Sequence, residues 1–324
     1  MPLSNNASFV PTMNEFIAHW TQVDAVLTPD LVVGIPGEGA VTLAGFSALR
    51  TALQEQFQRV IDALNDKEIA RGEIRLRKAR ALAHFNEFNA MLDGYWAGTA
   101  FVNARAYAPN FSDGQEVFLA PMRDVFSLWE KLNAGAAPAG VALPLVLSDG
   151  TTREEFGEEL AGIAGSYVAE AAANQGAVLA RSERDGLKER IRAILVSYRT
   201  VVPARCAQHG SLVETLPVLT PPPGHTPDAV VASAVFVAPD QARVVYEESA
   251  EASLERYELR GNPGEEYSDE DAVVIATNGV ADAREFVTGF GLSQPGTMVA
   301  LKVYVVLDTG NESGSATLTV ARPL

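Results

Sequence analysis

The residues best suited to metal chemistry are His84 and Glu87, three apart in a long stretch with helical spacing. Di-metal sites in helical bundles need Glu-x-x-His pairs that point inward from two helices. His84 and Glu87 give the reverse order once, and Ile194 stands 110 residues after His84, where a second copy would need its ligand. We therefore predict no metal ion and no other cofactor, and we interpret His84 as a surface residue or a hydrogen-bonded core residue.

Nucleophilic catalysis requires a nucleophile, a base and an orienting group in one place. The sequence has no Gly-x-Ser-x-Gly motif, and Cys206 and His209 are neighbours along the chain without a recognisable third partner. Gly34, Gly37 and Gly39 lie in a hairpin-like turn that lacks the lysine and the helix entry of a phosphate-binding loop. We therefore predict that the chain is no enzyme, with no catalytic, cofactor-binding or metal-binding residue.

Two groups of basic residues stand out, one at 71–80 and one about 110 residues later at 181–192. Acidic residues interrupt both groups. Such mixed charges are typical of a solvated helix face with ion pairs at a spacing of four, and we favour this over a polyanion-binding site. The basic residues are Arg71, Arg75, Arg77, Lys78 and Arg80, then Arg181, Arg184, Lys188, Arg190 and Arg192; the acidic ones are Glu68, Glu73, Glu183, Asp185 and Glu189.

The densest acidic run, at residues 265–271, reads Glu-Glu-Tyr-Ser-Asp-Glu-Asp. A calcium loop of the EF-hand kind needs acidic or amide residues at alternating positions, a glycine and a distal glutamate. The run lacks this spacing. We expect a solvated loop here rather than a calcium site.

The composition excludes some classes of partner. The 324 residues carry 41 acidic and 25 basic side chains, a formal net charge of −16, which disfavours nucleic acid. The single cysteine, Cys206, forms no internal disulfide. Residues 1–6 lack the features of a secretory signal, and no stretch is apolar and long enough for membrane insertion. The expected location is the cytoplasm by default, with unconventional export left open.

The sequence contains an internal repeat with a step of about 110 residues. Phe156 follows Phe46 by 110 positions, and Trp129 follows Trp20 by 109. A repeat fixes the architecture before any motif is considered. We expect the two tryptophans to fill equivalent places in the core. Further pairs are Phe16 and Phe126, Thr42 and Thr152, Leu53 and Ile163, Phe57 and Tyr167, Arg71 and Arg181, Glu73 and Glu183, Phe85 and Leu195, and Phe88 and Tyr198.

Each copy is predicted to contain two long antiparallel helices. In the first copy an apolar stripe runs from Ala44 to Leu64, Asn65 and Asp66 form a turn, and a second helix begins near Lys67. The corresponding helices of the second copy are about 152–175 and 176–202. Four such helices predict a duplicated, pseudo-twofold four-helix bundle over residues 1–215, with copies at about 13–106 and 122–206.

Shorter elements complete the two copies. We predict a helix at 13–28, a hairpin of 31–35 and 40–43 around 36–39, a helix at 122–132, and a strand at 143–147. Ser148, Asp149 and Gly150 read as a turn. Thr151 or Thr152 then begins the next helix, with Glu154 or Glu155 completing a capping box.

The composition changes near residue 216. Residues 216–225 are rich in proline, which favours an extended linker and forbids helix. Beyond it, residues 226–324 alternate apolar and polar positions in seven short stretches, the pattern of an antiparallel β-sandwich. The predicted fold class is thus multidomain α plus β. The predicted strands lie near 231–235, 244–246, 257–259, 273–275, 286–290, 301–307 and 318–320.

The end of the chain resembles a known family. Residues 298–315, Met-Val-Ala-Leu-Lys-Val-Tyr-Val-Val-Leu-Asp-Thr-Gly-Asn-Glu-Ser-Gly-Ser, followed by 316–320, resemble the last two strands of a fibronectin type III domain. The family's core tryptophan is replaced by Tyr246, and its corner tyrosine by Leu301 or Val299. The resemblance implies a spacer or binding module for residues 226–324 and no catalytic residue.

These observations favour a non-catalytic structural or protein-interaction protein. We expect a protein partner or self-association, with the sandwich as a spacer or presentation module, and no nucleic acid. The alternative is a carbohydrate- or cation-binding module carried on a helical scaffold. An enzyme with an unrecognised site in the bundle ranks third.

Overall fold

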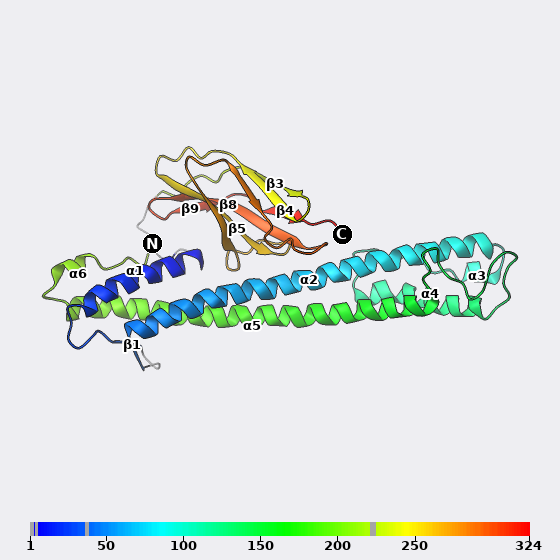
Figure 1. Ribbon diagram of the computed structural model, residues 1–324, viewed down its shortest axis with the longest axis horizontal. Helices are drawn as coiled ribbons and strands as arrows, with labels where there is room; N and C mark the ends of the chain where they lie inside the picture. Colours follow the sequence, from blue (N-terminus) through cyan, green and yellow to red (C-terminus); the bar gives the residue numbers. More distant parts are fainter. Residues whose placement is uncertain (1–2, 4–5, 36–38, 221–224) are drawn as a thin grey trace. The chain divides into compact units, whose positions relative to one another are not determined.

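The computed structural model describes residue 3 and residues 6–35, 39–220 and 225–324. Within these residues the chain is α plus β, with three antiparallel sheets (Figure 1). It divides into two compact units, Met1–Glu68 with Asn174–Pro323, and Ile69–Ala173. Residues 36–38 of the predicted hairpin turn and 221–224 of the predicted linker lie outside the described residues. The predicted domain boundaries stay predictions.

Three helical segments pack together in the first unit: α1 (Asn6–Asp24), the start of α2 (Leu43–Tyr95) and the end of α5 (Arg153–Arg205). Helix α1 begins earlier than predicted and ends at Asp24, whose Oδ1 accepts a hydrogen bond from the backbone of Leu31 at 2.9 Å. The short α6 (Gly210–Glu214) follows α5. Their shared core includes Phe9, Met13, Phe16, Trp20, Phe46, Leu53, Ile194 and Tyr198.

The predicted hairpin after α1 is confirmed. Strand β1 (Val33–Ile35) pairs antiparallel with β2 (Gly39–Val41). Gly39 has a positive φ of 88°, a conformation that glycine adopts without steric penalty. Val33 and Val41 are buried against the helical core, so the hairpin closes one side of it.

The second unit also combines one short helix with segments of the two long ones. Helix α4 (Gln115–Asn133) packs with the later part of α2 and the first part of α5, and α3 (Ala100–Asn103) follows α2. Trp129 is fully buried here, as Trp20 is nearly fully buried in the first unit, so both predicted core tryptophans are confirmed. The core also includes Phe85, Phe88, Leu92, Phe118, Met122, Phe156 and Ile163.

The predicted strand at Leu143–Leu147 is wrong. This segment has no strand assignment, although Leu145 and Leu147 are buried. Pro144 has no N–H to donate to a ladder. The Leu145 carbonyl instead accepts a hydrogen bond from Trp129 Nε1 at 3.1 Å, and the Leu147 N–H donates to the Thr151 carbonyl at 3.0 Å. A core side chain and a turn therefore make the hydrogen bonds that a partner strand would otherwise make.

The predicted four-helix bundle is not confirmed, because each predicted pair of long helices is one continuous helix. Helix α2 runs through Asn65 and Asp66, and α5 runs through Gln175 and Gly176. Asparagine and aspartate cost an α-helix only about 0.7 kcal/mol each relative to alanine, which tertiary packing readily offsets. A small core of Val60, Leu64, Ala177 and Ala180 lies beside these positions. The repeat itself agrees with the element lengths, because α1 and α4 both have 19 residues and α2 and α5 both have 53.

The last hundred residues form two antiparallel sheets. One has the strand order β3-β4-β7, and the other β10-β8-β5-β6, with β9 paired to β8 (Figure 1). All seven predicted strands overlap observed strands, and β9 was not predicted. The bounds are β3 (Ala232–Val237), β4 (Gln241–Tyr246), β5 (Leu254–Pro263), β6 (Val273–Gly279), β7 (Glu285–Thr288), β8 (Met298–Leu307), β9 (Glu312–Gly314) and β10 (Leu318–Ala321).

The core of this sandwich lies between the two sheets. Val244 of β4, Leu259 of β5 and Val303 of β8 are all fully buried in it. Strands β3 and β4 alternate in burial, as expected for a sheet with one solvated face. Strands β5 and β8 are instead buried at consecutive positions, so their sheet is covered on both faces.

Candidate functional site

Helix α5 and the segment between β5 and β6 supply the residues of a buried charge network in the first unit. Arg181 and Arg184 are three residues apart on α5, so they share one face of the helix. The β5–β6 segment is shaped by Asn262, whose Oδ1 accepts a hydrogen bond from the Ser268 N–H at 2.9 Å. The Ser268 carbonyl in turn accepts the Asp271 N–H at 3.1 Å. This folded segment places Asp271 opposite the arginines.

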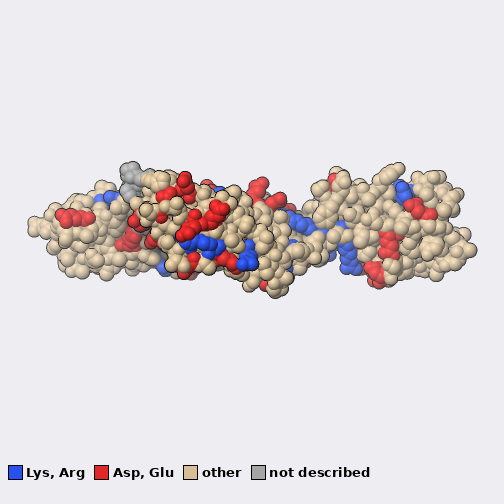
Figure 2. Space-filling model, turned by 90° about the horizontal axis from the view of Figure 1, so that it is seen from above, with Lys and Arg blue, Asp and Glu red and all other residues tan. Residues whose placement is uncertain are grey.

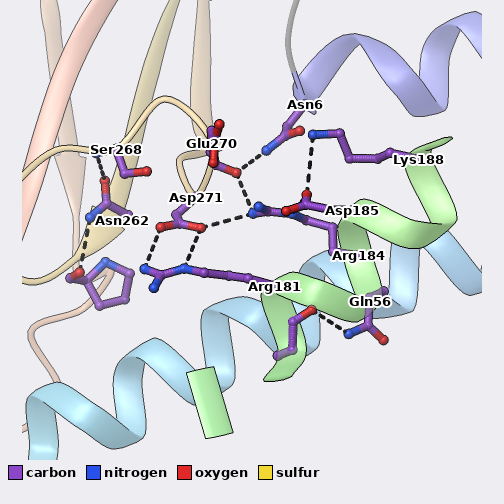
Figure 3. Close-up of polar contacts among 12 residues, drawn as sticks. Asn6, Gln56, Arg181, Arg184, Asp185, Lys188, Asn262, Ser268, Glu270 and Asp271 are labelled. Carbon is purple, nitrogen blue, oxygen red and sulfur yellow. Dashed lines mark hydrogen bonds and ion pairs between the residues drawn. The ribbon is translucent and has the colours of Figure 1, made fainter. Parts of the chain in front are cut away.

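Asp271 binds both arginines (Figure 3). Arg181 donates from Nε to Oδ1 at 3.0 Å and from Nη2 to Oδ2 at 2.6 Å, a bidentate pair. Arg184 donates from Nη1 to the same Oδ1 at 3.0 Å and to the backbone oxygen of Glu270 at 2.5 Å. The side chains of Arg184 and Asp271 are 1% and 4% exposed. The Arg184–Asp271 pair is therefore shielded from water, and the network joins α5 to the sandwich directly.

The electrostatics favour the ionised form of Asp271. Burial raises the pKa of its carboxyl group, but the hydrogen bonds and charges of Arg181 and Arg184 outweigh burial and hold this pKa below its ordinary value. Removing one partner of a buried ion pair costs about 3–5 kcal/mol, because the other charge stays buried without compensation. If Asp271 is removed, Arg184 is the charge that stays buried without compensation, since Asp185, its other ion-pair partner, is half exposed.

Helices α1 and α2 are tied to the same place. The Asn6 side-chain amide at the start of α1 donates to the Glu270 backbone oxygen, beside Arg184 (Figure 3). Gln56 of α2 donates from Nε2 to the Ala180 carbonyl at 2.9 Å and to Glu183 Oε2 at 3.2 Å. The network therefore connects α1, α2, α5 and the β5–β6 segment.

A second charge network lies on the sheet that contains β5. Arg260 donates from Nε and Nη2 to Glu258 Oε2 at 2.8 and 2.6 Å, and from Nη1 and Nη2 to Glu312 at 2.9 and 2.6 Å. Its guanidinium carbon lies 4.1 Å from the centre of the Tyr304 ring. Two cavities of about 260 and 180 Å³ here are both lined by Arg260, Glu312 and Ala7, so α1 helps to cover this face.

These contacts indicate what the two networks do. Each consists of oppositely charged groups that pair with one another in buried surroundings. Such pairs contribute little net stability compared with apolar packing, but they penalise every arrangement that leaves a charge buried and unpaired. The charged pairs therefore favour the arrangement in which this surface of the sandwich faces α5.

The structure corrects two predictions of solvated surface. We predict a solvated helix face for 181–192 and a solvated loop for 265–271, but Arg184 and Asp271 are buried and paired with each other. Helical spacing and acidic composition describe the segments separately and do not reveal that they meet. One signal was available: Asp271 directly precedes the apolar residues Ala272 and Val273, where β6 begins, so a buried carboxylate was plausible there.

The basic group at 71–80 is engaged within the second unit. Arg77 Nε lies 3.4 Å from Glu73, which confirms one predicted ion pair at a spacing of four. Arg71 reaches across to Glu170 of α5 at 3.1 Å, and the buried Lys78 donates to the Asp113 carbonyl at 2.7 Å. On the face shown in Figure 2, basic side chains lie among acidic ones rather than in one broad basic patch. The predicted solvated face is therefore wrong for Lys78, and the pairing of these residues within the chain supports a structural role for the group.

His84 is a hydrogen-bonded core residue, one of the two alternatives that we predict for it. It is 5% exposed, its Nδ1 lies 2.8 Å from Glu159 Oε2, and its Nε2 lies 3.0 Å from Asp149 Oδ2. Glu87 instead accepts a hydrogen bond from the Ser148 backbone at 2.6 Å. In the part of the chain that the structure describes, no three His, Cys, Asp or Glu side chains are grouped so as to hold a metal ion.

The other candidates have structural places. Cys206 is buried in the helical core, and burial raises the pKa of its thiol, which disfavours the reactive thiolate. His209 lies beside it through a backbone hydrogen bond to the Cys206 carbonyl at 2.8 Å. Gly34 and Gly39 belong to the β1–β2 hairpin, and Gly37 lies outside the described residues. Among the described helices, none is both long and apolar enough to cross a membrane.

Comparisons with known proteins add a partial likeness. No family model matches the chain, and no curated protein matches it. A solved Fn3-like protein from Clostridium thermocellum is 20% identical, with a TM-score of 0.25, over 31% of this chain and 97% of that one. The FN1-FN3 domains of chicken CNTN1 are 16% identical, with a TM-score of 0.25, over 32% of each chain.

A third neighbour is the pectate lyase PelI from Erwinia chrysanthemi, solved in complex with tetragalacturonic acid. It is 17% identical, with a TM-score of 0.24, over 28% of each chain. The present chain thus spans less than a third of the length of the CNTN1 and PelI chains. The structural neighbours include Fn3-like domains, at partial coverage and low TM-score.

Proposed function

We propose that this chain is a non-catalytic structural or protein-interaction protein. Its sandwich is a spacer or presentation module of the fibronectin type III kind, held on a helical scaffold, and its partner is another protein or a second copy of the chain. The observation that carries the proposal is the buried network of Arg181, Arg184 and Asp271, which binds the sandwich to α5 with directed, charged hydrogen bonds. A module held in this way presents its remaining surface in a constant orientation to α5.

The strand order supports the fibronectin-like part of the proposal. If β3, β4, β5, β7, β8 and β10 are lettered A, B, C, E, F and G, the sheets read A-B-E and G-F-C, with β6 added beside C. This is the order of immunoglobulin-like sandwiches that lack strand D. Tyr246 replaces the family's core tryptophan, and its ring packs 5.2 Å from Phe286 and 4.9 Å from Tyr257. Val299, at one of the two positions considered for the corner tyrosine, is fully buried.

The test compares wild type with Asp271→Asn and with Asp308→Asn, an exposed carboxylate of the same sandwich. Small-angle X-ray scattering of wild type should fit one fixed placement of the sandwich. Asp271→Asn should increase the radius of gyration and the maximum dimension, because Arg184 loses its counter-charge. Asp308→Asn should match wild type. A wild type that already requires many sandwich positions would overturn the proposal.

Light scattering on the same samples identifies the kind of partner. A mass that rises with concentration would favour self-association, and a constant mass of one chain would direct the search to a different protein. Saturable heat stabilisation by a sugar or a divalent cation would instead favour the alternative, a carbohydrate- or cation-binding module.

A further inference from the structure

His84 is held between two carboxylates that come from different segments of the second unit. It projects from α2, Glu159 belongs to the second turn of α5, and Asp149 lies in the turn that precedes α5. The two ring nitrogens lie 2.8 and 3.0 Å from carboxylate oxygens, and the histidine is 5% exposed. Both contacts are therefore of hydrogen-bond length; the Glu159 side chain is nearly buried, and the Asp149 side chain is half exposed.

The number of hydrogen-bond donors and acceptors around His84 indicates the protonation state of its ring. A neutral imidazole has one N–H donor and one acceptor nitrogen, whereas an ionised carboxylate only accepts. Asp149 is ionised, because hydrogen bonds from Thr151 and then from His84 lower its pKa to about 2. Glu159 faces a cation on its other oxygen, since Arg80 Nε lies 3.5 Å from Oε1. Two accepting carboxylates require two donating nitrogens, which is the imidazolium form.

His19 provides a contrast within the same chain. It is also 5% exposed, with Nδ1 2.7 Å from the Tyr198 hydroxyl and Nε2 2.8 Å from the Leu212 carbonyl. The hydroxyl can donate to Nδ1 while Nε2–H donates to the carbonyl. Burial raises the pKa of Tyr198, so its hydroxyl keeps the proton. A neutral imidazole satisfies both contacts of His19 but not both contacts of His84.

We propose that His84 is a doubly protonated clamp that fastens the turn Ser148–Thr151 and the start of α5 to α2. The other charged groups around it are Arg80 and Glu87 from α2 and Glu155 from α5. An unprotonated nitrogen facing Asp149 or Glu159 would set two acceptors against each other at hydrogen-bond distance. The clamp therefore needs a donor on both ring nitrogens.

The clamp controls one wall of a cavity. Asp149, Gly150 and Thr151 line an open cavity of about 530 Å³ together with Arg77, Arg80, Glu155, Glu158 and Glu159. Asp149 is the clamped residue of this turn, and the Ser148 N–H is held separately by Glu87. Removal of the His84 ring should thus free the Asp149 side of the turn first and change the shape of the cavity.

The direct test is the protonation of the ring nitrogens in the full-length wild-type chain, read from ¹H–¹⁵N NMR spectra at neutral pH. His84→Gln and His19→Gln assign the signals. We expect both nitrogens of His84 to give imidazolium signals, whereas His19 should show one protonated and one bare nitrogen. A His84 ring with one bare nitrogen would overturn the proposal, because the proton would then lie on Glu159.

Hydrogen exchange tests the consequence. At neutral pH the protection of residues 146–152 should be at least tenfold lower in His84→Gln than in wild type, because the ring that donates to Asp149 and Glu159 is gone. His19→Gln should keep the wild-type protection of these residues. A His84→Gln chain with wild-type protection of this turn would refute the clamp. If His84→Gln does not fold, the ring signals of the wild type still decide.

Discussion

The carboxylate of Asp271 accepts three hydrogen bonds from α5, so its charge state should control the stability of the first unit. Its folded-state pKa lies below the ordinary value of about 3.9. A lowered pKa means that the stabilisation is present above the unfolded-state pKa and is lost as the pH falls through the folded-state pKa. Stability from this residue should therefore decline only in acid.

Urea denaturation of wild type and Asp271→Asn tests this expectation. At pH 7 the substitution should lower the free energy of unfolding by about 3–5 kcal/mol, because Arg184 is left buried. The difference should begin to shrink below about pH 4, where Asp271 of the unfolded chain takes up a proton, and should be lost as the pH falls through the lower folded-state pKa. The exposed control Asp308→Asn should show little difference at any pH. A difference for Asp271→Asn that stays constant from pH 7 to pH 3 would contradict the assignment.

At the scale of elements, sequence patterns predict those helices and strands that depend on interactions between residues close together in the chain. The β1–β2 hairpin and seven strands of the sandwich were predicted because alternation and turn residues are local signals. Asn65 and Asp66 were misread as a turn, because the packing of Val60 and Leu64 against α5 is not visible in the local sequence. The charge network was missed for the same reason: Arg181 and Asp271 are 90 residues apart in the chain.

Substitutions at Asp66 distinguish a continuous helix from the predicted turn. Proline at this position would remove a helical hydrogen bond and clash with the preceding turn, so Asp66→Pro should destabilise the chain by about 3 kcal/mol or more. Asp66→Ala should be neutral or stabilising by a few tenths of a kcal/mol, because alanine is the better helix former. Thermal denaturation followed by circular dichroism measures both. Equal stability of the two variants would indicate a turn.

At the scale of the whole chain, the internal repeat is expressed as two separate helical cores. Trp20 packs with Phe46 and Tyr198 in the first, and Trp129 packs with Phe88 and Phe156 in the second. The long helices α2 and α5 contribute to both cores, each with a different segment. Among the described residues, the two hydrophobic clusters have no buried residue in common. They are connected because α2 and α5 each run continuously through both.

The repeat-related tryptophans measure how independent the two cores are. Trp129→Ala and Trp20→Ala should each cost about 3–5 kcal/mol, the usual penalty for removing a large buried side chain. Hydrogen exchange should localise each loss: α4 for Trp129→Ala and α1 for Trp20→Ala, with the other helix still protected. The matched variants Trp129→Phe and Trp20→Phe should show the same localisation with a smaller effect. If either alanine variant lowers protection equally in α1 and α4, the two cores unfold as one cooperative unit. The two copies of the repeat would then not be independent units of stability.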